Sequence, residues 1–111
     1  MKSGIQLSLL SVLLVVSQIA SAKITEIDQE NKAFTMDGNV VTTISVHVGD
    51  QLLFANKDKV YHNIFSMSDI SKFNFGAFAK GDSKSYTFNK PGKAKIECAI
   101  HPRMVLDVKV Q

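Results

Sequence analysis

Three side chains that bind soft metal ions occur within seven residues near the end of the chain. Residues 98–104 contain the only cysteine of the 111-residue sequence, one of its three histidines and one of its four methionines, in the order Cys-x2-His-x2-Met. The Cys98 thiolate, the His101 imidazole and the Met104 thioether form a set that suits copper above other common metals. We therefore interpret these three residues as candidate metal ligands.

A second histidine would complete the set of two histidines, one cysteine and an axial methionine that is found in blue-copper sites. The other histidines of the chain are His47 and His62. His47 falls on the face of the predicted strand 41–48 that we expect to meet solvent, so we assign His62 to the site. Met67 is an alternative axial ligand to Met104.

Each candidate ligand also has a simpler explanation. Cys98 could be a buried free thiol, which packs as a small hydrophobic residue. Met104 begins an apolar strand and could serve only in the core, and His101 could be an exposed loop residue. The close spacing of the three favours metal binding, since the single cysteine has no partner for a disulfide within the chain.

The first 22 residues have the three parts of a secretory signal peptide. Residues 1–4 include a lysine, residues 5–19 are mostly apolar and uncharged, and Ala20-Ser21-Ala22 is a small-residue cleavage site. The alternative is a membrane anchor, but the apolar run is shorter than the roughly 20 residues that a spanning helix needs. We expect cleavage after Ala22, one mature domain over residues 23–111, and no stable membrane insertion.

The charge and the histidine count exclude two classes of function. The net charge is only +3 and the sequence has no block of lysine and arginine, so nothing indicates nucleic-acid binding. Oxidases and nitrite reductases that use several copper ions need further histidine clusters, which three histidines cannot supply. We do not expect a stand-alone enzyme.

Short segments of alternating polar and apolar residues, separated by turn signals, predict an all-β protein. The clearest turn is Asn89-Lys90-Pro91-Gly92, and Asp37-Gly38 is typical of a hairpin. The alternation fails over residues 67–78, for which we expect a long loop that ends near Gly76. The predicted fold is a Greek-key β-sandwich of about seven to eight strands. The expected strands are 23–27, 31–36, 41–48, 51–55, 60–66, 83–88, 93–98 and 104–110.

The last two predicted strands carry the candidate ligands to one end of the core. Alternate side chains of the strand 93–98 face inward, and Cys98 is the last of them. The strand 104–110 begins with an inward-facing Met104, and His101 lies in the connecting loop. The period of two therefore predicts that the three side chains lie close together.

The sequence resembles small cupredoxins of the plastocyanin and amicyanin type over essentially the whole mature chain. The resemblance rests on the His62-Asn63 pair and on the Cys-x2-His-x2-Met motif, with support from the strand and turn over residues 83–92. The two-residue gap between the histidine and the methionine of the motif is most similar to that of amicyanin.

This resemblance implies one type 1 copper ion, held by His62, Cys98 and His101, with Met104 as the weak axial ligand. It also implies that Asn63 ties the ligand loop to the neighbouring strand and hydrogen-bonds near the thiolate. Such contacts orient metal ligands and tune the reduction potential.

The function implied by the resemblance is that of a monomeric, periplasmic one-electron carrier whose copper cycles between Cu(I) and Cu(II). Plastocyanins typically have a tyrosine where this chain has Glu97, which leaves the exposed edge of His101 as the expected electron path. Ile100 and Pro102 flank His101 and predict a small apolar patch there. The implied partners are transient redox proteins, such as a dehydrogenase donor and a c-type cytochrome acceptor.

Two other functions are compatible with the sequence. A copper carrier or buffer would bind the metal without shuttling electrons. A metal-free β-sandwich that binds a partner would not need the Cys98 thiol.

Overall fold

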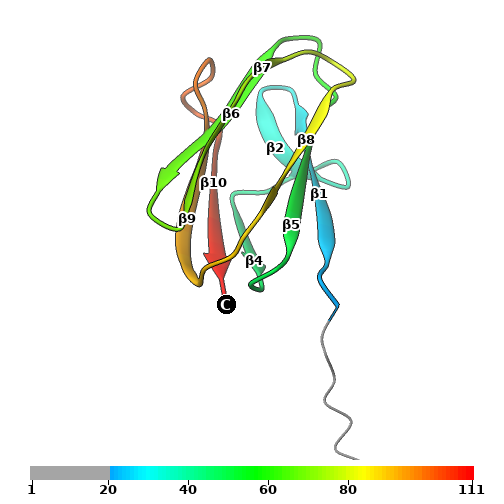
Figure 1. Cartoon of the computed structure of the whole chain (residues 1–111). Coiled ribbons are helices and arrows are strands. Elements are labelled where there is room, and N and C mark those ends of the chain that lie inside the picture. Colours follow the sequence, from blue (N-terminus) through cyan, green and yellow to red (C-terminus); the bar gives the residue numbers. More distant parts are fainter. Residues whose placement is uncertain (1–20) are drawn as a thin grey trace, which may run out of the picture.

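The computed structural model describes residues 21–111, which form two five-stranded β-sheets packed face to face (Figure 1). The strands are β1 (Ile24–Glu30), β2 (Ala33–Met36), β3 (Asn39–Val40), β4 (Thr43–Val46), β5 (Gln51–Asn56), β6 (His62–Ser68), β7 (Ser71–Phe78), β8 (Ser83–Thr87), β9 (Gly92–Cys98) and β10 (Val105–Val110). The first sheet has the order β3-β2-β1-β5-β8 and the second the order β4-β10-β9-β6-β7. The predicted all-β sandwich is confirmed.

The predicted signal peptide, residues 1–22, lies outside the described residues apart from Ser21 and Ala22, and it stays a prediction. Within residues 21–111, the structure contains no helix that is long and apolar enough to cross a bilayer.

The core lies between the two sheets, because alternate residues of each strand point toward the opposite sheet. In β5, Leu52 and Phe54 are fully buried, and Phe54 packs edge-on against Phe34 of β2. Each fully buried side chain of this size stabilises the fold by about 1.5–3 kcal/mol. The predicted inward faces of the last two strands are also confirmed. The buried residues on those faces are Ala94, Ile96, Cys98, Leu106, Val108 and Val110.

The prediction of a long loop over residues 67–78 is wrong, because most of this segment is the edge strand β7. Phe73 and Phe75 are more buried than the polar residues beside them, as in any half-covered strand. Gly76, with a φ of 71°, then interrupts the alternation, so that Phe78 becomes the next buried position. The register with β6 also shifts within this pair of strands, as in a β-bulge. The extra residue in β7 at this bulge breaks the alternation of polar and apolar residues, so the sequence pattern did not predict a strand.

Two further expectations about strands are corrected. The described residues form ten strands instead of seven to eight, because β3 and β7 add to the eight expected segments. The strand expected over residues 41–48 is limited to β4. In a strand Val48 would face inward, because it follows the outward-facing His47, but it is 47% exposed since it lies beyond the end of β4.

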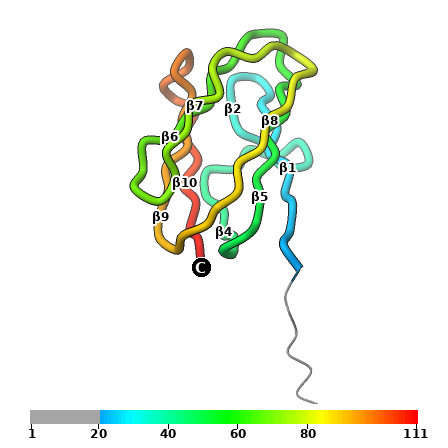
Figure 2. The backbone as a smooth tube through the Cα atoms, in the orientation of Figure 1, coloured from blue at the N-terminus to red at the C-terminus, as the bar shows by residue number. Residues whose placement is uncertain are grey.

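Two connections lie at the end of the sandwich opposite the C terminus (Figure 2). One is the segment 57–61, which crosses from β5 in the first sheet to β6 in the second. The other is the loop 99–104 between β9 and β10. Because β6 and β9 are antiparallel neighbours, the start of β6 lies beside the end of β9.

Candidate metal centre

Sheet pairing brings His62 and Cys98 together although 36 residues separate them. Ile64 of β6 is the register partner of Cys98 of β9, and His62 lies two residues before Ile64 on the same inward face. His62 is completely buried and Cys98 is 2% exposed. The histidine therefore projects from the first residue of its strand toward the thiol at the end of the neighbouring strand.

A turn after Cys98 brings the third side chain to the same place. The Met104 backbone N–H donates a hydrogen bond to the His101 carbonyl oxygen at 3.0 Å, which closes the turn before β10. His101 is half-buried, and its Nδ1 atom faces Cys98 and His62. The local spacing in the motif thus produces a pair of potential ligands, one buried and one at the surface.

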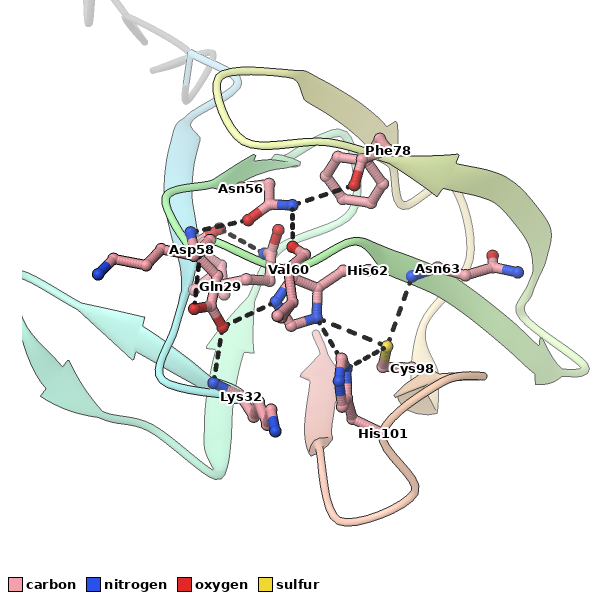
Figure 3. A network of polar contacts seen from close by, with 12 residues as sticks. Gln29, Lys32, Asn56, Asp58, Val60, His62, Asn63, Phe78, Cys98 and His101 are labelled. Atoms are coloured by element: carbon pink, nitrogen blue, oxygen red, sulfur yellow. Dashed lines mark hydrogen bonds and ion pairs between the residues drawn. The ribbon is translucent and has the colours of Figure 1, made fainter.

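Three ligand atoms converge in this cluster (Figure 3). The Cys98 Sγ atom lies 3.7 Å from His62 Nδ1 and 3.6 Å from His101 Nδ1. The two Nδ1 atoms are 3.2 Å apart. Atoms that bond one ion at about 2.0–2.3 Å, as histidine and cysteine do, are separated from one another by roughly 3–4 Å. The spacing and the soft sulfur and imidazole donors fit one copper ion.

Met104 and Met67 have different surroundings. Met104 is 2% exposed and belongs to the same buried cluster as Cys98. Its role as an axial ligand stays a prediction. Met67 is 75% exposed, on the outward face of β6, so the structure does not bring this alternative ligand to the site. His47 is also exposed, as predicted, and its nearest charged partner is Asp50.

The expected link between Asn63 and the ligand loop is present and is made by the backbone. The Asn63 N–H donates to Cys98 Sγ at 3.4 Å, and the Asn63 carbonyl accepts from the Ala99 N–H at 2.9 Å. The amide contact helps to fix the position of the sulfur atom, which would be a metal ligand. The same two contacts fix the start of the ligand loop against β6.

Asp58 is a member of the site that the sequence did not reveal. Its Oδ2 atom lies 3.0 Å from His62 Nε2, on the side of the ring that faces away from Cys98. The four-residue spacing from Asp58 to His62 within a polar loop is common in proteins and carries no specific signal. Only the path of the segment 57–61 places the carboxylate behind the imidazole.

The electrostatics of the pair formed by His62 and Asp58 suit metal binding by His62. Burial lowers the pKa of His62, Asp58 opposes this effect, and the nearby His101 lowers the pKa further, for a net decrease. Burial raises the pKa of Asp58, but the backbone N–H groups of Lys32 and Lys59 and the His62 ring outweigh it, so the pKa is lowered overall. At neutral pH the pair is therefore a neutral imidazole beside a carboxylate.

Comparisons with known proteins give matches among solved structures. A purple cupredoxin from Nitrosopumilus maritimus is 28% identical, with a TM-score of 0.65 over 78% of this chain and 99% of that chain. A reduced, singly substituted mutant of amicyanin is 20% identical, with a TM-score of 0.69 over 83% of this chain and 86% of that chain. The chain has the cupredoxin fold. No family model and no curated protein matches its sequence.

One further structure with the cupredoxin fold is an enzyme. The copper-containing nitrite reductase from Thermus scotoductus is 20% identical, with a TM-score of 0.67 over 78% of this chain. Only 22% of that enzyme's chain is covered, so this cupredoxin-fold protein corresponds to about one fifth of its length. The fold together with the cluster of His62, Cys98 and His101 supports a blue-copper electron carrier in general terms.

Proposed function

We propose that this protein is an exported type 1 copper protein that carries single electrons between redox partners. The observation that supports this most is the cluster of Cys98 Sγ and the Nδ1 atoms of His62 and His101, which lie 3.2–3.7 Å from one another in a cupredoxin fold. His62, Cys98 and His101 would hold copper, with Met104 as the axial ligand. Bound copper supplies a one-electron couple between Cu(I) and Cu(II).

The residues of the proposed site have different roles. Cys98 and His62 are buried, which excludes water from the sulfur and from one imidazole. His101 is half-buried at the surface and is the proposed point of electron exchange. Ile100, which is 50% exposed, and the exposed Pro102 flank it and form a small apolar surface. Such a surface suits a brief redox encounter, which typically buries less than about 1,200 Å².

Changing Ile100 to glutamate tests the proposed exchange point. The copper-loaded wild type is expected to show a reversible one-electron couple by voltammetry. In Ile100→Glu we expect the same couple and the same visible spectrum, because the ligands are intact. The rate of electron exchange with an acidic or apolar partner is expected to fall about tenfold or more, since a rim charge chiefly changes the rate of association.

The matched control is Val48→Glu. Val48 has a similar exposure to Ile100, at 47%, but it lies beside the C-terminal residue Gln111 at the opposite end of the sandwich. An Ile100→Glu rate equal to that of the control would contradict exchange through His101. A wild type that binds and readily releases Cu(I) without a reversible couple would favour a copper buffer.

The proposed mature N terminus is Lys23, which follows the A-x-A site. The Lys23 N–H donates to Asp50 Oδ1 at 2.9 Å, and the Lys23 carbonyl accepts from the Gln51 N–H at 2.9 Å. These bonds support a folded domain that begins at this residue. Intact-mass measurement of the protein exported from a bacterial host is expected to show removal of residues 1–22. A retained N-terminal segment would contradict cleavage after Ala22.

The partners and the location belong to the same proposal. The short Cys-x2-His-x2-Met loop supports an amicyanin-like role in the periplasm, between a dehydrogenase donor and a c-type cytochrome acceptor. We further propose that the carrier is a monomer, because a brief encounter requires the small surface around His101 to stay free.

A further inference from the structure

The His62 imidazole has two hydrogen-bonding sides that meet different groups. Its Nδ1 atom faces Cys98 and His101, and its Nε2 atom faces the Asp58 carboxylate (Figure 3). We propose that Asp58 is a positioning residue that fixes the orientation and tautomer of His62 and favours Cu(II) over Cu(I). The effect on copper rests on the proposed function, whereas the effect on the His62 tautomer does not.

The Asp58 carboxylate is held in place by two different segments of the chain. Its Oδ2 atom accepts from the Lys32 N–H at 2.8 Å, in the turn between β1 and β2. Its Oδ1 atom accepts from the Lys59 N–H at 3.0 Å. The side chain is only 12% exposed. A carboxylate that is bonded in this way loses little freedom when it also accepts a hydrogen bond from His62.

Asn56 holds the loop that carries Asp58. Its Oδ1 atom accepts from the Asp58 N–H at 2.8 Å, and its Nδ2 group donates to the carbonyls of Val60 and Phe78, each at 3.0 Å. Asn56 is itself buried. The position of the carboxylate behind His62 is therefore built into the fold and does not depend on a flexible surface chain.

The chemistry of the contact follows from the donor and acceptor types. An ionised carboxylate only accepts hydrogen bonds, so the Nε2 atom of His62 must carry the proton and Nδ1 presents its lone pair to the cluster. A carboxylate behind a metal-bound histidine orients the ring and makes it a stronger donor. The negative charge also stabilises the more highly charged ion, and burial limits its screening by salt.

Two variants distinguish the effect of the Asp58 charge from the effect of its hydrogen bond to His62. Asp58→Asn removes the charge but keeps an acceptor oxygen, and Asp58→Ala removes both. In Asp58→Asn, Cu(II) affinity is expected to fall by about 10- to 100-fold, as for other groups behind metal-bound histidines. If Cu(I) affinity is unchanged, each tenfold loss raises the reduction potential by about 59 mV. The control is Asp69→Asn, a carboxylate with the same change in net charge, in the turn between β6 and β7.

A second readout uses the metal-free protein. Nitrogen NMR of the histidine side chains is expected to show His62 protonated at Nε2 in the wild type and a mixture of tautomers in Asp58→Ala. An unchanged Asp58→Asn potential would overturn the proposed preference for Cu(II). A His62 protonated at Nδ1 in the wild type would overturn the positioning role. A wild type without a copper couple would instead contradict the proposed function, and the tautomer would still report on Asp58.

Discussion

Replacing Cys98 with serine is expected to abolish the intense visible absorption of the copper-loaded protein. The band requires a thiolate bonded to Cu(II), and Cys98 is the only cysteine in the chain. Serine is close in size, so the buried position at the end of β9 tolerates it, but its hydroxyl is a poor ligand for a soft metal. The absorption spectrum after addition of Cu(II), recorded for both proteins at equal concentration, is the measurement.

Met67→Ser is the matched control for this experiment. It also removes one sulfur atom, but from a side chain that is 75% exposed and outside the cluster. We expect the control to keep the full band. If Cys98→Ser retained the band, the copper–thiolate assignment would be wrong. If the wild type showed no band, the copper assignment would be replaced by a site for a different metal or by a metal-free binding module.

Changing Asn56 to alanine is expected to destabilise the metal-free protein by about 2–4 kcal/mol, because each buried polar group left without a partner costs about 1–3 kcal/mol. The Asn56 side chain serves three backbone groups: the Asp58 N–H and the carbonyls of Val60 and Phe78. Some of these groups would gain water, which keeps the cost below the sum of three. Urea denaturation of the metal-free protein gives the free energy of unfolding directly.

The comparison for Asn56 is Asn39→Ala in the exposed strand β3. A surface change of this kind usually alters the free energy of unfolding by no more than about 0.5 kcal/mol. A loss of less than about 1 kcal/mol in Asn56→Ala would show that the loop 57–61 does not depend on this side chain. The same variant should also weaken the Asp58 contact with His62, because Asn56 holds the loop that carries Asp58.

Features encoded locally were predictable from the sequence. The alternation that ends at Cys98 and resumes at Met104 placed both side chains on inward faces, and the structure confirms their burial. The short loop between them brought His101 to the same end of the core. These inferences succeeded because the period of a strand and the length of a loop depend on consecutive residues.

Features that depend on pairing between distant segments were harder to predict from the sequence. The segment 71–78 escaped prediction as a strand because Gly76 and the register shift opposite β6 break the period of two. His62 was selected partly because His47 was predicted to lie on an exposed face and partly from the resemblance that the His62-Asn63 pair carries. Its position 3.7 Å from Cys98 follows from the pairing of β6 with β9, which no local pattern specifies.

The amino-acid sequence by itself determined the types of the potential ligands, the inward faces of the last two strands and the all-β class. Each of these depends only on residue types and on the spacing between residues close together in the chain. The tertiary structure brought His62, which the sequence had only indicated, next to Cys98 and His101, and it placed Asp58 behind that histidine. The physical reason is that hydrogen bonding between β6 and β9 and the path of the segment 57–61 set distances between residues far apart in the chain.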